Sequence, residues 1–142
     1  MLTGIYCTLT VGESELDKGD GKGMAWIYKQ STGELFHNGE MIEQGYAGRM
    51  TNKNNPDRQQ VRGLGPLPQG AYHIGGYTHS KGPLTITLIQ TSGESYGRSA
   101  FRIHGERIAP PAGWASEGCI IMGYHTRRLI ALSSDRTLKV IR

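Results

Sequence analysis

The stretch Leu84-Thr85-Ile86-Thr87-Leu88 alternates apolar and polar side chains over its whole length. Alternation with a period of two places the two leucines and the isoleucine on one face of an extended strand. Residues 84–88 therefore predict a β-strand with one buried face, and a mainly β fold can be built outward from it.

A second strand is predicted at residues 99–104, which read SAFRIH. Phe101 and Ile103 fall on one face of this strand, whereas Arg102 and His104 fall on the other. His104 is therefore expected to point away from the apolar face that packs into the core.

The rest of the chain predicts short strands joined by turns. Further strands are expected at residues 24–30, 34–37, 71–74 and 137–141, with a short helix at 127–132 that Thr126 caps. Residues 45–69 are rich in Asn, Gly and Pro and predict a long loop.

Glycine is the outlier of the composition. The 142 residues include 21 glycines, about twice the usual share of roughly 7%, which favours tight turns between strands over a helical bundle. The apolar share of 37% and the charged share of 20% are those of a soluble globular protein. The length fits a single domain over residues 1–142.

The formal net charge of +4 favours an anionic partner. Lysine and arginine are scattered rather than massed in one run, and no nucleic-acid-binding motif is present, so nucleic acid is not the expected partner. Peptidoglycan, whose stem peptides carry carboxylates, is an anionic surface that fits equally well.

Residues 1–11 lack the basic and apolar segments of a signal peptide, and no stretch has the ~20 apolar residues of a membrane span. We therefore expect neither export by a standard signal nor membrane insertion. The two cysteines, Cys7 and Cys119, leave two readings open, a disulfide or a free catalytic thiol, and these exclude each other.

The chemistry is expected between residues 98 and 123. His104-Gly105 ends a predicted strand, and Ser116-Glu117-Gly118-Cys119 follows after a loop rich in Pro and Gly. Imidazole is a base near neutral pH, and an adjacent imidazolium holds a cysteine as thiolate. Gly118 permits a sharp turn that directs backbone amides at an oxyanion, and Ser116 is expected to brace this turn.

The His-Gly pair followed by Ser-x-Gly-Cys resembles the active-site signature of L,D-transpeptidases of the YkuD type. Four further segments resemble the small L,D-transpeptidase-like effectors of type VI secretion systems, and the likeness extends from about residue 24 to residue 141. These segments are WIYKQSTG at 26–33, GPLPQGAY at 65–72, GRS at 97–99 and ASEGC at 115–119.

This resemblance implies a β-sandwich-like fold with a short helix after the catalytic loop. It implies that Cys119 attacks the bond between diaminopimelate and the terminal D-alanine of a stem tetrapeptide, with His104 as base and a carbonyl near Gly105 orienting the ring. Water would complete an L,D-carboxypeptidase reaction, and an amine would complete a transpeptidase reaction. It further implies a toxin made in the cytoplasm, delivered to the periplasm of a target bacterium, and neutralised by a cognate immunity protein.

The resemblance departs from the family pattern at Ile121, where an arginine is common. Arg98, Arg127 and Arg128 are candidates to replace it, since a guanidinium pairs well with a carboxylate. The residues predicted to bind substrate are Arg98, Arg102, Trp114, Tyr72 and Arg127.

Other readings of the same residues remain open. Cys119 in its apolar context can be a buried small hydrophobe, His104 a structural histidine, and Trp114 and Tyr72 supports beneath a loop. The chain can also be another thiol peptidase acting on a different stem bond, or a non-catalytic wall-binding module. No metal and no cofactor are expected, because no metal-ligand spacing appears. A monomer is also expected.

Overall fold

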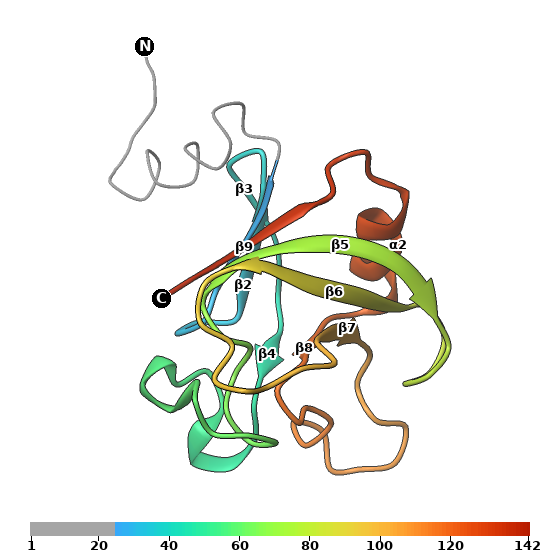
Figure 1. Cartoon of the computed structure of the whole chain (residues 1–142). Helices are drawn as coiled ribbons and strands as arrows, with labels where there is room; N and C mark the ends of the chain where they lie inside the picture. Colours follow the sequence, from blue (N-terminus) through green and yellow to red (C-terminus); the bar gives the residue numbers. More distant parts are fainter. Residues whose placement is uncertain (1–24) are drawn as a thin grey trace.

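The computed structural model describes residues 25–142 (Figure 1). Met24, included in the first predicted strand, and Cys7 lie outside the described residues. The strands are β1 Ala25–Lys29, β2 Glu34–His37, β3 Glu40–Gln44, β4 Tyr46–Ala47, β5 Gly70–Thr78, β6 Thr85–Ser92, β7 Arg102–His104, β8 Ile120–Ile121 and β9 Thr137–Ile141. The helices are α2 Tyr124–Leu132 and two single 3-10 turns, η2 Met50–Asn52 and η3 Pro56–Arg58.

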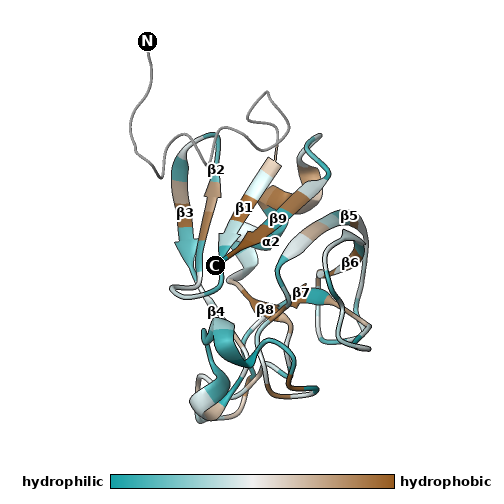
Figure 2. Cartoon of the chain, turned by 60° about the vertical axis from the view of Figure 1, so that its left-hand side comes forward, coloured by the Kyte–Doolittle hydropathy of each residue, from teal (hydrophilic) through white to brown (hydrophobic). Residues whose placement is uncertain are grey.

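All nine strands belong to one sheet, in the order β3-β2-β1-β9-β5-β6-β7-β8-β4. The pairs β1–β9 and β7–β8 are parallel, and the other pairs are antiparallel. The sheet curls until it nearly closes into a barrel, with α2 beside it (Figures 1 and 2). The predicted mainly β single-domain fold with a short helix after the loop is confirmed, and its strands form one continuous sheet.

Gly45 forms the seam of this near-barrel. The edge strands β3 and β4 are separated in the chain by this one residue, so the two edges of the sheet must approach each other there. The Gly45 N–H donates to the carbonyl of Gly33 at 2.8 Å, while a Cβ on Gly45 would lie 1.9 Å from the carbonyl oxygen of Ile121. Only glycine has room at this position.

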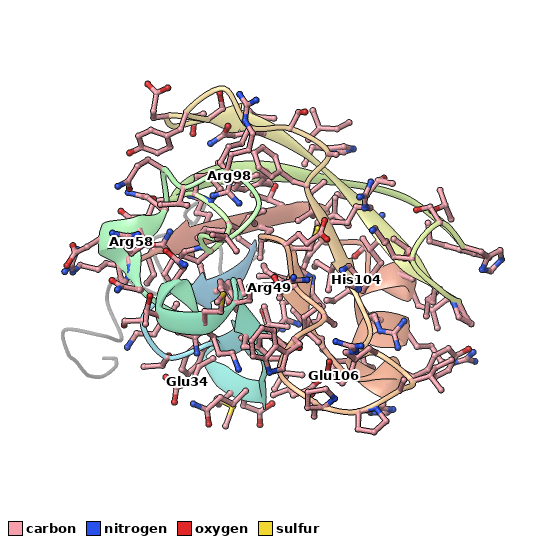
Figure 3. The ribbon with its side chains drawn as sticks, turned by 90° about the horizontal axis from the view of Figure 1, so that it is seen from below. Glu34, Arg49, Arg58, Arg98, His104 and Glu106 are labelled. Atoms are coloured by element: carbon pink, nitrogen blue, oxygen red, sulfur yellow. The ribbon has the colours of Figure 1, made fainter. Side chains whose placement is uncertain are left out.

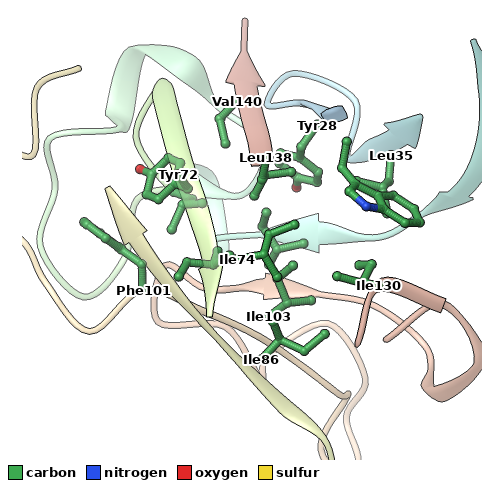
Figure 4. Close-up of a cluster of buried hydrophobic side chains, with 14 of the residues drawn as sticks. Tyr28, Leu35, Tyr72, Ile74, Ile86, Phe101, Ile103, Ile130, Leu138 and Val140 are labelled. Carbon is green, nitrogen blue, oxygen red and sulfur yellow. The ribbon is translucent and has the colours of Figure 1, made fainter. Parts of the chain in front are cut away.

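The core lies inside the curled sheet (Figure 4). Its side chains come from strands throughout the sheet and from α2, and the fully buried ones include Trp26, Tyr28, Leu35, Tyr72, Ile74, Ile86, Ile103, Ile130 and Leu138. In Figure 2, β8 and β9 carry the colour of apolar residues along much of their length. Burying this apolar surface is the main favourable contribution to folding.

The strand predicted at residues 84–88 is confirmed from Thr85 onward and continues to Ser92, whereas Leu84 lies outside it with a φ of 59° and Thr85 is buried. Ile86 and Leu88 are buried, and Thr87 between them is half-buried. β5 also runs beyond its predicted end at residue 74, and β3 was not predicted at all. β3 is an exposed edge strand without an apolar face, so its pairing with β2 leaves little trace in the hydropathy pattern.

Two local predictions are wrong. The strand predicted at 99–104 begins only at Arg102, because Ala100 adopts a left-handed conformation with φ of 61°. Thr126 is buried within α2 rather than capping it; the N-cap is Gly123, whose N–H is accepted by the Glu43 carboxylate at 3.0 Å. A carboxylate is favourable there, because the helix N-terminus carries partial positive charge.

Residues 45–69 form the predicted long loop, interrupted by β4 and the two 3-10 turns. In the part of the chain that the structure describes, no helix has the length and apolar character needed to cross a bilayer.

The seam predicts a stability effect at Gly45. Gly45→Ala should lower the free energy of unfolding by about 1–3 kcal/mol, because the added methyl group overlaps the Ile121 carbonyl. Gly76→Ala is the matched control, since a Cβ there meets nothing within 4 Å, and should change it by less than about 0.5 kcal/mol. Urea denaturation measures both, and equal midpoints for the two variants would contradict the role of the seam.

Candidate functional site

His104 and Cys119 come together because β7 and β8 are parallel neighbours. Ile103 pairs with Ile120 and His104 with Ile121, so Cys119, one residue before β8, lies beside Arg102. Both side chains line a cavity of about 280 Å³. Cys119 is 8% exposed and His104 is 5% exposed, so both side chains are largely screened from solvent.

The His104 ring is held by the backbone. Its Nδ1 lies 3.0 Å from the carbonyl oxygen of Gly105, and a carbonyl can only accept, so Nδ1 carries the proton in this contact. This leaves Nε2 as the basic nitrogen of the neutral imidazole. The carbonyl that orients the ring is thus that of Gly105, the next residue in the chain.

The Cys119 thiol is not hydrogen-bonded to His104 in the described structure. Sγ instead donates a long hydrogen bond of 3.9 Å to the carbonyl oxygen of Ala100, and Arg102 also hydrogen-bonds to the thiol. Cys119 is a free cysteine. The pair therefore shares a cavity wall in the resting protein, a looser arrangement that is common in sites without substrate.

Ser116 organises the turn before Cys119. Its side chain is fully buried, accepts from the N–H groups of Gly48 at 2.8 Å and Gly118 at 3.0 Å, and donates to the Cys119 carbonyl at 2.6 Å. One hydroxyl thus joins the catalytic turn to the segment after β4. Because the Gly118 N–H is engaged with Ser116, the Cys119 N–H is the better candidate donor to an oxyanion.

Gly118 packs directly against Arg98. Gly118 has φ of 117°, and a Cβ there would lie 2.0 Å from Arg98 Nη2. The buried Arg98 guanidinium donates to three backbone carbonyls of the long loop, those of Gln59, Gly65 and Pro66. Arg98, labelled in Figure 3, lines the cavity, but its donors fix the loop against the turn before Cys119.

Arg127 and Gly105 repeat this arrangement on the other side of His104. A Cβ on Gly105 would lie 2.7 Å from Arg127 Nη2. Arg127 is buried and donates to the carbonyls of Met122, Gly123, Pro83 and Leu84. Of the three arginines proposed to replace the family arginine at Ile121, Arg98 and Arg127 thus bind backbone oxygens, and Arg128 is exposed on α2. Ile121 itself is buried.

The other predicted substrate-binding residues fall in three different places. Arg102 is half-buried and lines the cavity of Cys119. Tyr72 is fully buried in the core, donates to the Pro68 carbonyl at 2.7 Å and packs edge-on against Phe101. Trp114 is 39% exposed and lines a neighbouring cavity of about 470 Å³. The structure therefore brings only Arg102 to Cys119 and leaves Tyr72 without surface for a ligand.

Two site residues were missed by the sequence analysis. Lys81 lines both cavities, and Arg49 lines the second one and donates to the Ser116 and Trp114 carbonyls. Arg49 and His104, both labelled in Figure 3, share that second cavity. No motif marks either cation, because each reaches the site from a loop distant in the sequence.

The model of the Tlde1 domain matches residues 42–141. This range contains both sequence motifs, both cavities and most of the sheet. The chain belongs to the Tlde1 domain family. This is a family of type VI secretion effectors, in agreement with the resemblance drawn from the motifs. No curated protein and no solved structure matches the chain.

Burial is the largest influence on the pKa values of Cys119 and His104 in this Tlde1 domain. It raises the pKa of the Cys119 thiol, an effect that the nearby charges of Arg102 and Lys81 oppose only in part. Burial lowers the pKa of His104, and the charges of Lys81, Arg102 and Arg127 lower it further against the raising effect of the Gly105 carbonyl. The resting site thus holds a neutral thiol and a neutral imidazole, whereas the sequence analysis expected a thiolate and an imidazolium.

No cluster of three or more His, Cys, Asp or Glu side chains able to hold a metal ion occurs within residues 25–142. The polar groups around Cys119 are instead cationic side chains and backbone amides, which suit an anionic organic ligand.

Removing the Ser116 hydroxyl should destabilise the Tlde1 domain. Ser116→Ala strands the buried N–H groups of Gly48 and Gly118, each at a cost of about 1–3 kcal/mol. Ser134→Ala, at an exposed position, should change the free energy of unfolding by less than about 0.5 kcal/mol. Chemical denaturation compares them, and an unchanged Ser116→Ala midpoint would show that the turn does not depend on this hydroxyl.

The neutral pair predicts a late thiol titration. In a Cys7→Ser background, the rate at which iodoacetamide alkylates folded Cys119 should rise with pH with a midpoint above about 8.5, the ordinary cysteine value, because burial raises its pKa. The same protein unfolded in urea is the control and should titrate near about 8.5. A folded midpoint below the unfolded one would instead reveal a preformed thiolate.

Proposed function

We propose that this Tlde1 domain is a cysteine acyl-transfer enzyme of the L,D-transpeptidase type that acts on peptidoglycan stem tetrapeptides. The observation that carries the proposal is the shared cavity, in whose wall a free thiol and a backbone-oriented imidazole lie on adjacent parallel strands. A nucleophile, a base and an orienting acceptor are the parts that acyl transfer requires.

Acylation starts from the neutral pair. Nε2 of His104 takes the thiol proton as Sγ of Cys119 attacks the carbonyl carbon of diaminopimelate, forming the carbon–sulfur bond. The tetrahedral oxyanion is met by the backbone N–H of Cys119 and by the positive charge of the cavity. The imidazolium then gives its proton to the leaving amine as the carbon–nitrogen bond breaks, which releases D-alanine and leaves a thioester.

The acceptor decides the product. When water attacks the thioester, His104 takes its proton, a new carbon–oxygen bond replaces the carbon–sulfur bond, and the thiol is regenerated with a tripeptide as product. When the amine of a D-amino acid or of another stem attacks, the product contains a new amide bond. The first course is L,D-carboxypeptidase activity, and the second is transpeptidase or exchange activity.

The charge of the site supports an anionic wall fragment as substrate. The cavity lining contains several cationic side chains, and the formal charge of the chain is +4. Cationic walls around a small cavity concentrate anions and speed their binding. A stem peptide with free carboxylates has the required charge.

Membership of an effector family supports a role as an antibacterial toxin. We propose that the enzyme is delivered by the type VI secretion system to the periplasm of a target cell, where it removes tetrapeptide donors that the wall needs for cross-linking. A cognate immunity protein would protect the producing cell by covering the cavity of Cys119. Failure to find any neutralising protein in the producing strain would count against this role.

Mass spectrometry of purified tetrapeptide muropeptides tests the reaction. The Cys7→Ser protein should release the terminal D-alanine as fast as the unchanged chain, and should exchange it when another D-amino acid is added. Cys119→Ala should abolish both reactions, and His104→Gln should slow them by at least about 100-fold, the scale of a general base.

Three other results have different meanings. Cleavage at another stem bond that still needs Cys119 would make the chain a different thiol peptidase. Activity that survives Cys119→Ala would remove the proposed nucleophile. Tight binding of the muropeptide without any turnover, by protein shown to be folded and reduced, would make it a wall-binding module.

A further inference from the structure

The cavity of Cys119 carries more positive than negative charge. Besides His104, its charged lining residues are Arg62, Lys81, Arg98, Arg102 and Glu117. The one carboxylate is that of Glu117, whose side chain is 64% exposed. It lies 3.7 Å from Nη2 of Arg49, a residue that does not line this cavity. The net positive lining calls for a negatively charged ligand group.

Most of the arginines in or beside this cavity are already engaged. Arg98 donates to three loop carbonyls, and Arg127 behind Gly105 donates to four others. Arg62 at the rim donates to the Gly97 carbonyl at 3.0 Å. Each of these guanidinium groups already uses at least one N–H group on a backbone carbonyl, so none has all of its donors free for a carboxylate.

Arg102 differs from them in having no oxygen partner. Within residues 25–142 its side chain forms no ion pair and no hydrogen bond to an oxygen, and its buried Nε is without any hydrogen-bond partner. Unpartnered buried donors are rare in folded proteins, and they call for an explanation. The side chain as a whole is half-buried and lines the cavity, so its other N–H groups can meet a ligand oxygen there.

The position of Arg102 is also suitable. It precedes Ile103 in β7 and so lies across from Cys119, and its charge acts on both the Cys119 sulfur and the His104 ring. Lys81 lines the same cavity, is exposed, and acts on the same two groups. Two cations that have no carboxylate partner among the described residues therefore lie beside Cys119, and the side chain of one of them, Arg102, also hydrogen-bonds to the Cys119 thiol.

We propose that Arg102, assisted by Lys81, binds the free C-terminal carboxylate of the residue that leaves, so that the enzyme cleaves only at the end of a peptide. The inference rests on the proposed function and names its specificity residues. A guanidinium fork binds a carboxylate through two parallel charge-assisted hydrogen bonds. Arg102 thereby supplies the guanidinium that the family pattern expects near Ile121.

The carboxylate clamp formed by Arg102 and Lys81 has a consequence for the exchange of D-amino acids. Breaking the bond to D-alanine and making the bond to an incoming D-amino acid are the same step in opposite directions, so both amino acids occupy the same place. A free D-amino acid should then be accepted through its carboxylate, and its amide should not be.

The kinetic test compares the stem tetrapeptide ending in a free carboxylate with the same peptide ending in a carboxamide. The unchanged enzyme should prefer the acid by roughly 10-fold to 100-fold in kcat/KM, the range of a charge-assisted pair. Arg102→Met should remove this preference, Arg102→Lys should keep part of it, and Lys81→Met should reduce it. Arg128→Met, which removes a charge from an exposed position outside the cavity, should leave it unchanged.

The acid-to-amide ratio separates the clamp from other effects of Arg102. Loss of its charge also changes the pKa of Cys119, and the ratio of binding affinities in the Cys119→Ala background, which lacks this thiol, is free of that effect. A ratio near one in the unchanged enzyme, or one that Arg102→Met leaves intact, would overturn the inference while the proposed reaction stands.

A binding test keeps the inference independent of turnover. In the Cys119→Ala background, calorimetry should show the free-acid peptide binding roughly ten times or more tightly than the amide, and adding Arg102→Met should make the two affinities equal. Equal affinities before that change would overturn the clamp even if the enzyme is active. A clear preference for the acid without any turnover would support the clamp and reject the proposed reaction.

Discussion

The sheet nearly closes at Gly45, and the position of Cys119 follows from that near-closure. Because β3 and β4 are the two edges of the sheet yet are joined by one residue, the ninth strand in the order must return to the first. This return holds β8 between β4 and β7. The parallel pairing of β7 with β8 then sets Cys119 beside Arg102 and near His104. A near-barrel thus positions, by backbone constraint alone, two residues that are fifteen positions apart in the chain.

Buried arginines turn this backbone frame into a rigid site. Arg98 lies against Gly118 and Arg127 lies against Gly105, and each gives its donors to backbone carbonyls rather than to carboxylates. Burying a guanidinium is costly unless its N–H groups are satisfied, and several carbonyl oxygens satisfy them. Gly118 next to Cys119 and Gly105 next to His104 therefore have a packing role: a Cβ at either one would displace the guanidinium that fixes its loop.

Local patterns predicted much of this molecule, and contacts distant in sequence decided the rest. The alternation at 84–88, the terminal strand and the short helix all follow from side-chain periodicity, which needs no partner. The His-Gly and Ser-x-Gly-Cys motifs marked the residues that share the cavity. The engagement of Arg98 by residues 59–66 could not be predicted, because nothing in the sequence near Arg98 marks its partners. Lys81 was missed for the same reason, and β3 because its stability comes from pairing rather than from an apolar face.

Charge connects substrate recognition to catalysis in this site. The positive charges of Arg102 and Lys81 lower the pKa of Cys119 and also lower the pKa of His104. In the proposed mechanism they therefore stabilise the thiolate that acylation forms, but they disfavour the imidazolium that forms with it. A carboxylate bound by the proposed clamp cancels part of this positive charge. Its neutralisation raises the proton affinity of His104 when a substrate with a free C-terminus is present. In the proposed mechanism the substrate carboxylate therefore strengthens the base, and a peptide without a free C-terminus meets both a weaker base and weaker binding.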